Sequence, residues 1–200
     1  MRLIIVDGLD GVGKDTHARL IKERYEKKGD KVVVRSHPES DNFYGRTAKK
    51  ALLGQGKINR LKASLFYALD VMYSLRRYYR RPTCDTLIMV RYLMGTAYLP
   101  RRLTKTGYRF FDKLVPTSRY MFFLDATPEE LVERIKQRSE TEMFETQEAF
   151  LKVRAKALDL VQGWYIINTG QSIEQTFGAI EKVLDTLDSK AVSHPVRPVI

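Results

Sequence analysis

A glycine-rich segment near the amino terminus, Gly-Leu-Asp-Gly-Val-Gly-Lys-Asp-Thr at residues 8–16, constrains the fold of this chain more than any other feature. It follows a short apolar run at 3–7 that predicts a buried strand. It opens the segment 14–28, whose apolar residues recur at helical spacing. Glycine lets the backbone fold tightly enough for several N–H groups to point at one phosphate, and the helix adds the positive end of its dipole. We therefore expect a phosphate-binding loop between a strand and a helix.

The spacing Gly-x-x-x-x-Gly-Lys within this segment is the frame of a Walker A motif. Lys14 is expected to reach the β- and γ-phosphates of a nucleotide. The predicted nucleotide-binding residues all lie in the loop and the start of its helix: Gly8, Leu9, Asp10, Gly11, Val12, Gly13, Lys14, Asp15 and Thr16.

The residue after the lysine departs from the motif, because Asp15 stands where a serine or threonine hydroxyl binds Mg²⁺, and Thr16 comes next. A carboxylate is a good Mg²⁺ ligand, but its charge opposes that of phosphate unless the metal lies between them. Three roles stay open. Asp15 binds the metal directly or through water, Thr16 does so after a small shift, or Asp15 only favours the helix dipole. Asp15 and Thr16 are thus the candidate metal ligands.

The rest of the chain alternates strand and helix patterns. Strands are predicted at 3–7, 31–35, 86–90, 119–125 and 164–168, and helices at 14–28, 41–54, 58–80, 128–138, 146–161 and 172–187. Thr127 and Ser172 are predicted helix caps. Such alternation predicts an α/β protein of the P-loop NTPase three-layer type, with a five-stranded parallel sheet and helices on both faces.

The long helix predicted at 58–80 has an apolar side formed by Leu61, Leu65, Ala68, Leu69, Met72 and Leu75. Packing in a monomer core and packing against a second subunit explain this side equally well. The helix ends in a basic and aromatic cluster at 76–81, which suits nucleic acid, a solvated helix end, or an active-site role for Arg76 or Arg77. We favour the solvated end over polynucleotide binding.

The net charge of +11 favours anionic partners, either nucleic acid or nucleotide phosphates. Cys84 is the single cysteine, which excludes an internal disulfide, and no apolar run is long enough to span a membrane. We expect a cytoplasmic protein without membrane contact. Residues 1–190 are predicted to form one domain, and 191–200, which hold two prolines and no periodicity, to form a mobile or extended tail.

Beyond the loop, several segments in order resemble thymidylate kinases, and the resemblance covers nearly the whole chain. The segments that carry it are Gly8–Lys14, Ser36-His37-Pro38-Glu39 after the second strand, Leu65-Phe66-Tyr67-Ala68-Leu69-Asp70, Arg91-Tyr92, Thr96-Ala97-Tyr98, Phe123-Leu124-Asp125, Pro128-Glu129, Arg134, Arg138, Phe144-Glu145, Asn168-Thr169 and Ser172-Ile173-Glu174. The loop is the most specific match.

The resemblance implies transfer of the γ-phosphoryl group of ATP to dTMP, giving dTDP, with ATP and Mg²⁺ bound and with a homodimer that pairs through helices near the long one. It implies catalytic roles for Lys14, Asp10, Arg91, Arg134 and Arg138, the last two with a mobile lid at about 138–146. On the acceptor side it implies Ser36, His37, Phe66, Tyr67, Asp70, Arg91 and Tyr98. Tyr67, or Phe66 one residue earlier, would stack on the base.

Four positions depart from the family pattern. Val90 stands where the family has the aspartate of Asp-Arg-Tyr, and Val71, Ser36 and Met143 replace basic residues. Asp15 would compensate for Val90 by supplying the missing charge at the metal. Since Val71 and Ser36 fall on the acceptor side, a kinase for another pyrimidine monophosphate or small acceptor stays open. Val90 and Asp15 keep a second alternative open, a nucleotide-binding regulatory protein with weakened catalysis.

Overall fold

The computed structural model describes residues 1–54, 56–98, 101–136 and 147–193. The strands are β1 (Arg2–Gly8), β2 (Val32–Ser36), β3 (Thr86–Val90), β4 (Tyr120–Asp125) and β5 (Tyr165–Asn168). The α-helices are α1 (Lys14–Glu26), α2 (Phe43–Leu52), α3 (Lys57–Ser74), α4 (Arg101–Leu114), α5 (Pro128–Lys136), α6 (Gln147–Leu158) and α7 (Ile173–Ser193). A π-helical turn, η1 (Leu75–Tyr79), continues α3, and a 3-10 helix, η2 (Met94–Tyr98), follows β3.

The five strands form one sheet in the order β2-β3-β1-β4-β5, and every neighbouring pair is parallel. Val6 in the central strand pairs with Val90 on one side and Phe122 on the other. The predicted five-stranded parallel sheet is therefore confirmed. All five strands end at the same edge, where a parallel α/β sheet usually binds its ligand.

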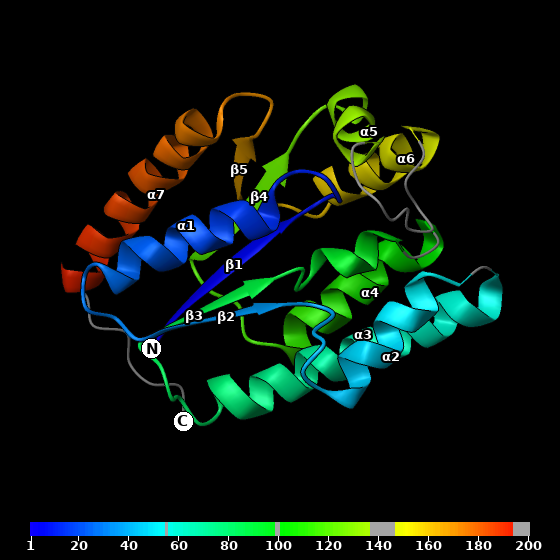
Figure 1. Cartoon of the computed structure of the whole chain (residues 1–200), viewed down its shortest axis with the longest axis horizontal. Helices are drawn as coiled ribbons and strands as arrows, with labels where there is room; N and C mark the ends of the chain where they lie inside the picture. Colours follow the sequence, from blue (N-terminus) through cyan, green and yellow to red (C-terminus); the bar gives the residue numbers. More distant parts are fainter. Residues whose placement is uncertain (55, 99–100, 137–146, 194–200) are drawn as a thin grey trace.

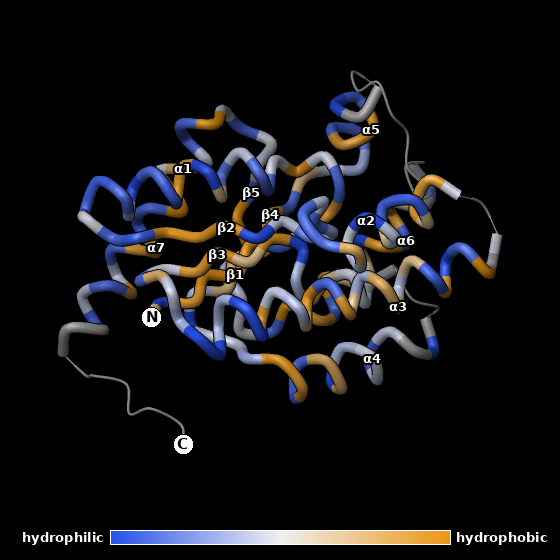
Figure 2. Tube along the Cα trace, turned by 60° about the horizontal axis from the view of Figure 1, so that its bottom comes forward, coloured by the Kyte–Doolittle hydropathy of each residue, from blue (hydrophilic) through white to orange (hydrophobic). Residues whose placement is uncertain are grey.

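Helices cover both faces of the sheet, which makes three layers. In Figure 2, α1 lies on one side of the strands, and α3 and α4 lie on the other. The strands are the most hydrophobic part of the trace, because both of their faces are buried. Ile4, Ile88 and Phe122 in neighbouring strands are fully buried.

Two predicted caps open helices as expected. At the start of α5, the Glu130 carboxylate accepts the Thr127 N–H at 2.8 Å, and the Thr127 hydroxyl accepts the Glu130 N–H at 3.4 Å. Ser172 and Gln175 exchange the same pair of bonds at the start of α7, at 3.3 and 3.2 Å. Each exchange satisfies backbone donors that the first helical turn leaves unpaired.

The apolar side of α3 divides into an exposed and a buried part. Leu61 and Leu65 are 73% and 55% exposed, whereas Val71 and Leu75, further along, are buried in the core. Packing in the monomer core therefore does not explain the amino-terminal leucines. Arg76 and Arg77 lie in η1, which leads to the amino end of β3 and away from the edge where the strands end, so the structure does not support their alternative active-site role.

The helix α4 was not predicted, because Thr104, Thr106 and Gly107 are weak helix formers. Tyr108 and Phe111 pack its inner side against the core. The last helix reaches Ser193, so the first three residues of the predicted tail are helical, and 194–200 lie outside the described residues. None of the helices in the described ranges has the length and apolar character needed to cross a bilayer.

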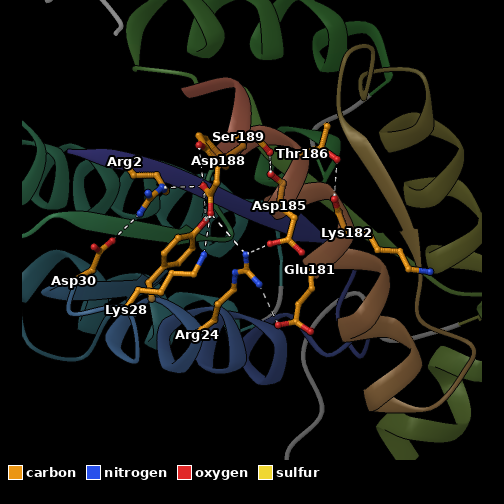
Figure 3. A network of polar contacts seen from close by, with 12 residues as sticks. Arg2, Arg24, Lys28, Asp30, Glu181, Lys182, Asp185, Thr186, Asp188 and Ser189 are labelled. Carbon is orange, nitrogen blue, oxygen red and sulfur yellow. Dashed lines mark hydrogen bonds and ion pairs between the residues drawn. The ribbon is translucent and has the colours of Figure 1, made fainter. Parts of the chain in front are cut away.

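The final helix is tied to the amino-terminal half of the chain by a polar network around Asp188 (Figure 3). The Asp188 carboxylate accepts hydrogen bonds from the hydroxyls of Tyr25 at 3.1 Å and Tyr120 at 3.2 Å. It also pairs with Lys28 at 3.4 Å and Arg2 at 3.5 Å. This network joins α7 to α1, β1 and β4 at the end of the sheet opposite the glycine loop (Figure 1).

Candidate active site

The glycine loop connects β1 to α1 at the edge where the strands end (Figure 1). At Gly8 a side chain would clash, since a Cβ atom there would lie 2.3 Å from the Leu124 carbonyl oxygen. Gly11 and Gly13 adopt φ angles of +87° and +83°, which favour glycine. The three glycines are thus required by a close approach to β4 and by left-handed turns, as a phosphate-binding loop needs.

Lys14, the first residue of α1, is buried under the loop. Its ammonium donates to the Leu9 carbonyl oxygen at 2.5 Å and lies 3.4 Å from the Asp10 carboxylate. Burial lowers the pKa of Lys14 to about 8, even though Asp10 favours the charged form. The structure therefore places the predicted catalytic residues Lys14 and Asp10 together.

Arg91, the first residue after β3, lies above the same loop. Its guanidinium pairs with Asp15 at 3.0 Å and with Asp10 at 3.7 Å, and donates to the Ser36 hydroxyl at 2.8 Å. Burial disfavours the charge, but the two carboxylates prevail and raise the pKa of Arg91. Arg91 thus joins the donor loop to Ser36, a predicted acceptor-side residue at the end of β2.

Asp15 faces Arg91 and Ser36. Its carboxylate accepts the Ser36 hydroxyl at 2.5 Å. The Asp15 side chain is 59% exposed. Partial desolvation opposes its charge, but Arg91 and Ser36 outweigh this and lower the pKa of Asp15, so it is ionised at neutral pH. Among the described residues no group of three or more His, Cys, Asp or Glu side chains forms a ready-made metal site.

Tyr67 and Phe66, the alternative stacking residues, point to different places. The Tyr67 hydroxyl donates to the Arg91 carbonyl oxygen, and its ring would be 3.3 Å from a Cβ at Gly95. The Phe66 ring instead packs edge-on against Phe43 of α2, with 5.9 Å between centroids. Tyr67 is therefore the aromatic residue beside Arg91.

His37 and Asp70, both predicted on the acceptor side, are buried and support the loop after β2. The His37 ring lies 3.2 Å from the Val90 carbonyl oxygen and 3.0 Å from the Ser74 hydroxyl. Asp70 accepts the Glu39 N–H at 2.8 Å and the Asn42 side-chain amide at 2.6 Å. At 1% and 0% exposure respectively, neither residue presents a surface to a ligand in this structure.

Arg134 reaches the segment after β5, where it donates to the Thr169 carbonyl oxygen at 2.7 Å. The second predicted lid arginine, Arg138, the lid at 138–146 and the side chain of Tyr98 lie outside the described residues.

Two charged residues at this edge were missed by sequence reasoning. Asp7, the residue before the loop, accepts the backbone N–H groups of Tyr92, Leu93 and Met94 at 3.0, 2.7 and 3.1 Å. Arg154 of α6 binds the carboxylate of Asp125, the last residue of β4, through two bonds at 2.8 and 2.7 Å. Asp7 could have been found from the sequence, because it is a carboxylate at the end of a predicted buried strand. No pattern in the sequence points to Arg154.

The model of the thymidylate kinase family matches residues 6–180. The chain belongs to this family. A thymidylate kinase from Bifidobacterium longum subsp. infantis is 27% identical over 90% of this chain and 84% of its own length. A probable thymidylate kinase from Thermococcus kodakarensis is 26% identical over 92% of this chain and 97% of its own length. The predicted family resemblance is confirmed.

The thymidylate kinase of Candida albicans has a similar fold, with a TM-score of 0.73 at 19% identity over 94% of this chain and 92% of its own. The fold likeness and the sheet order confirm the predicted P-loop NTPase architecture. The region that matches the family includes the glycine loop, Arg91 and Arg134. In this chain Arg91 pairs with Asp15, and Arg134 donates to the Thr169 carbonyl oxygen.

Proposed function

We propose that this chain is an ATP-dependent kinase that transfers the γ-phosphoryl group of ATP to dTMP and releases ADP and dTDP. The position of Arg91 carries the proposal. Its guanidinium lies between Asp10 and Asp15 of the donor loop and contacts Ser36 at the end of β2. A cation at this junction can neutralise charge on the phosphoryl group as it passes from donor to acceptor.

The donor side of the proposed reaction rests on the loop and Lys14. The loop amides and the amino end of α1 would hold phosphate oxygens, and the Lys14 ammonium would leave the Leu9 carbonyl to bind them. Arg134, which donates to the Thr169 carbonyl oxygen after β5, would bind the donor nucleotide. Arg138 belongs to the proposal through the family resemblance. During transfer the bond from the γ-phosphorus to the β,γ-bridging oxygen breaks, and a phosphate oxygen of dTMP forms the new bond.

Mg²⁺ is part of the proposal, because it would supply charge neutralisation between the phosphates of ATP. The Thr16 hydroxyl and the Asp15 carboxylate are oxygen donors of the kind that Mg²⁺ prefers, so the residues present fit the ion. Asp15 is already engaged by Arg91 and Ser36. The phosphates themselves and Thr16 are therefore the ligands that remain open to the metal.

On the acceptor side, Tyr67 would stack on the pyrimidine next to Arg91, and Ser36 would face its phosphate. Tyr98 and the supporting residues His37 and Asp70 complete this part of the proposal. We place the reaction in the cytosol, where a free thiol such as Cys84 persists.

A homodimer is the second part of the proposal. Ile58, Leu61, Leu65 and Leu69 share one side of α3 and are 84%, 73%, 55% and 38% exposed. Phe43 on the adjacent α2 is 62% exposed. An exposed apolar stripe of this size on a helix pair is typical of a surface that a second copy covers in a two-fold dimer.

The function is tested by measuring ADP release with purified protein, ATP, Mg²⁺ and a panel of nucleoside monophosphates. We expect turnover with dTMP and a loss of at least about a hundredfold in kcat for Lys14→Ala and for Arg91→Ala. If turnover occurs only with another monophosphate, that monophosphate replaces dTMP as the proposed acceptor. ATP binding without turnover of any acceptor would contradict the kinase assignment.

A further inference from the structure

Asp15 makes contacts that a threonine or serine at its position would not make in the same way. One carboxylate oxygen accepts the Ser36 hydroxyl at 2.5 Å and lies 3.3 Å from Arg91, and the other oxygen lies 3.0 Å from the same guanidinium. Both oxygens are therefore engaged by protein groups. The contacts link the first turn of α1 to the ends of β2 and β3.

The register of the sheet relates this contact to the missing carboxylate at Val90. Ser36 and Val90 are paired residues at the ends of β2 and β3, so the hydroxyl bound by Asp15 comes from the direct neighbour of Val90. Val90 is fully buried and has no charge to offer to Arg91, the next residue. The carboxylates beside Arg91 thus come from the glycine loop, as Asp10, and from the first turn of α1, as Asp15, and not from the strand.

The geometry points to Asp15 as a positioning residue: with Ser36 it holds the Arg91 guanidinium over the phosphate loop before nucleotides bind. This inference rests on the proposed kinase function. It assigns Asp15 to orienting Arg91, whereas the sequence left its role open between metal binding and the helix dipole.

The backbone of Arg91 limits where its side chain can go. Its φ angle is +54°, in the left-handed region, and its N–H donates to the Val6 carbonyl oxygen at 3.3 Å. The Tyr67 hydroxyl binds its carbonyl oxygen. Since the main chain is held on both sides, the remaining freedom lies in the long side chain, and contacts to its guanidinium decide whether it stays over the loop.

Charge balance gives a second reason for a carboxylate at this position. Lys14 and Arg91 are two cationic side chains at the loop. Asp10 lies within 3.4 Å of Lys14 and 3.7 Å of Arg91, so one carboxylate is shared between two cations. Asp15 supplies the second carboxylate and lets both cations remain at the loop without substrate.

The kinetic test compares Asp15→Asn, Asp15→Ser, Arg91→Lys and the double variant Asp15→Asn/Arg91→Lys. We expect both Asp15 variants to lower kcat about tenfold, or about 1.4 kcal/mol, while the Mg²⁺ concentration for half-maximal rate stays within about twofold. Because Asp15 acts through Arg91, adding Asp15→Asn to Arg91→Lys should lower kcat by less than about a further twofold. Glu23→Gln is the matched control, since it removes a carboxylate of α1 whose ion pair within the described residues is with the exposed Arg19 at 3.9 Å.

A metal-ligand role predicts a different pattern. Asp15→Asn would then raise the Mg²⁺ concentration for half-maximal rate. Asp15→Ser, which restores the Walker A hydroxyl, would return that concentration to the wild-type value. That pattern, or independent effects of Asp15→Asn and Arg91→Lys, would overturn the positioning role.

A measurement without substrate separates this inference from the proposed function. In arginine side-chain NMR of the ligand-free protein, the signal of the Arg91 guanidinium is identified as the one that is missing from the spectrum of the Arg91→Lys variant. We expect its Nη hydrogens to exchange slowly with water in the wild type and at least about tenfold faster in Asp15→Ser, with Glu23→Gln unchanged. Equal exchange in wild type and Asp15→Ser would refute the inference whatever acceptor the enzyme uses, whereas absence of dTMP turnover would refute only the proposed function.

Discussion

The Lys14 ammonium donates to the Leu9 carbonyl oxygen at 2.5 Å, so the lysine of the glycine loop is folded back onto the loop that it serves. The Asp10 carboxylate, 3.4 Å away, is its second partner. Phosphate oxygens must compete with both groups for the same ammonium. Nucleotide binding therefore exchanges contacts within the loop for contacts to the ligand.

The first prediction concerns the pH dependence of this exchange. The pKa of Lys14 is about 8 without ligand, and a bound phosphate raises it, because an anion favours the charged form. ATP affinity should therefore be constant well below pH 8 and fall as the pH rises through 8, by up to about tenfold per unit. Calorimetric titration at pH 7 and pH 9, in buffers of different ionisation enthalpy, should show proton uptake growing with pH. Lys14→Met should remove the increase, and an increase that persists in this variant would contradict the assignment.

The second prediction separates the two aromatic candidates. Tyr67→Leu should raise the KM for dTMP by about tenfold or more, because the ring beside Arg91 is lost. Phe66→Leu is the matched control: its ring packs on Phe43, so the KM should change by less than about threefold. Steady-state kinetics at saturating ATP measures both. A larger effect at Phe66 than at Tyr67 would reverse the assignment.

The third prediction concerns subunit association through the exposed stripe on α3. Leu65→Glu should convert a dimer into a monomer, because a charge would be buried in the apolar interface. Leu151→Glu is the control, since Leu151 is 50% exposed on α6, a helix outside the pair α2 and α3 that carries the stripe. Light scattering coupled to size-exclusion chromatography reports the mass. A wild-type chain that is monomeric at tens of micromolar would exclude the dimer.

The fourth prediction tests the anchor of the last helix. Asp188→Ala should lower the free energy of unfolding by about 2 kcal/mol, because the hydroxyls of the buried residues Tyr25 and Tyr120 lose their acceptor. Asp159→Ala, which breaks an exposed ion pair with Lys105 at 3.9 Å, should change it by less than about 0.5 kcal/mol. Urea denaturation followed by circular dichroism measures both. Equal effects of the two substitutions would show that the network contributes no more than a surface pair.

The strands could be predicted because each is an apolar run rich in β-branched or aromatic residues, as parallel strands buried on both faces must be. The caps at Thr127 and Ser172 were predicted for an equally local reason, since each bonds a residue three positions on. The helix α4 escaped prediction because Thr104 and Gly107 weaken its propensity, and packing of Phe111 against the core compensates.

The glycine loop, its lysine and the alternation of strands and helices that yields five parallel strands could all be predicted from the chain, because they depend on neighbouring residues. The partner of Asp15 was decided by tertiary structure alone. Arg91 reaches it only because β3 lies between β1 and β2 in the sheet, which brings the end of β3 next to Ser36 and the start of α1. A contact between residues so far apart in sequence depends on strand order and on a left-handed backbone at Arg91, and neither leaves a local pattern in the chain.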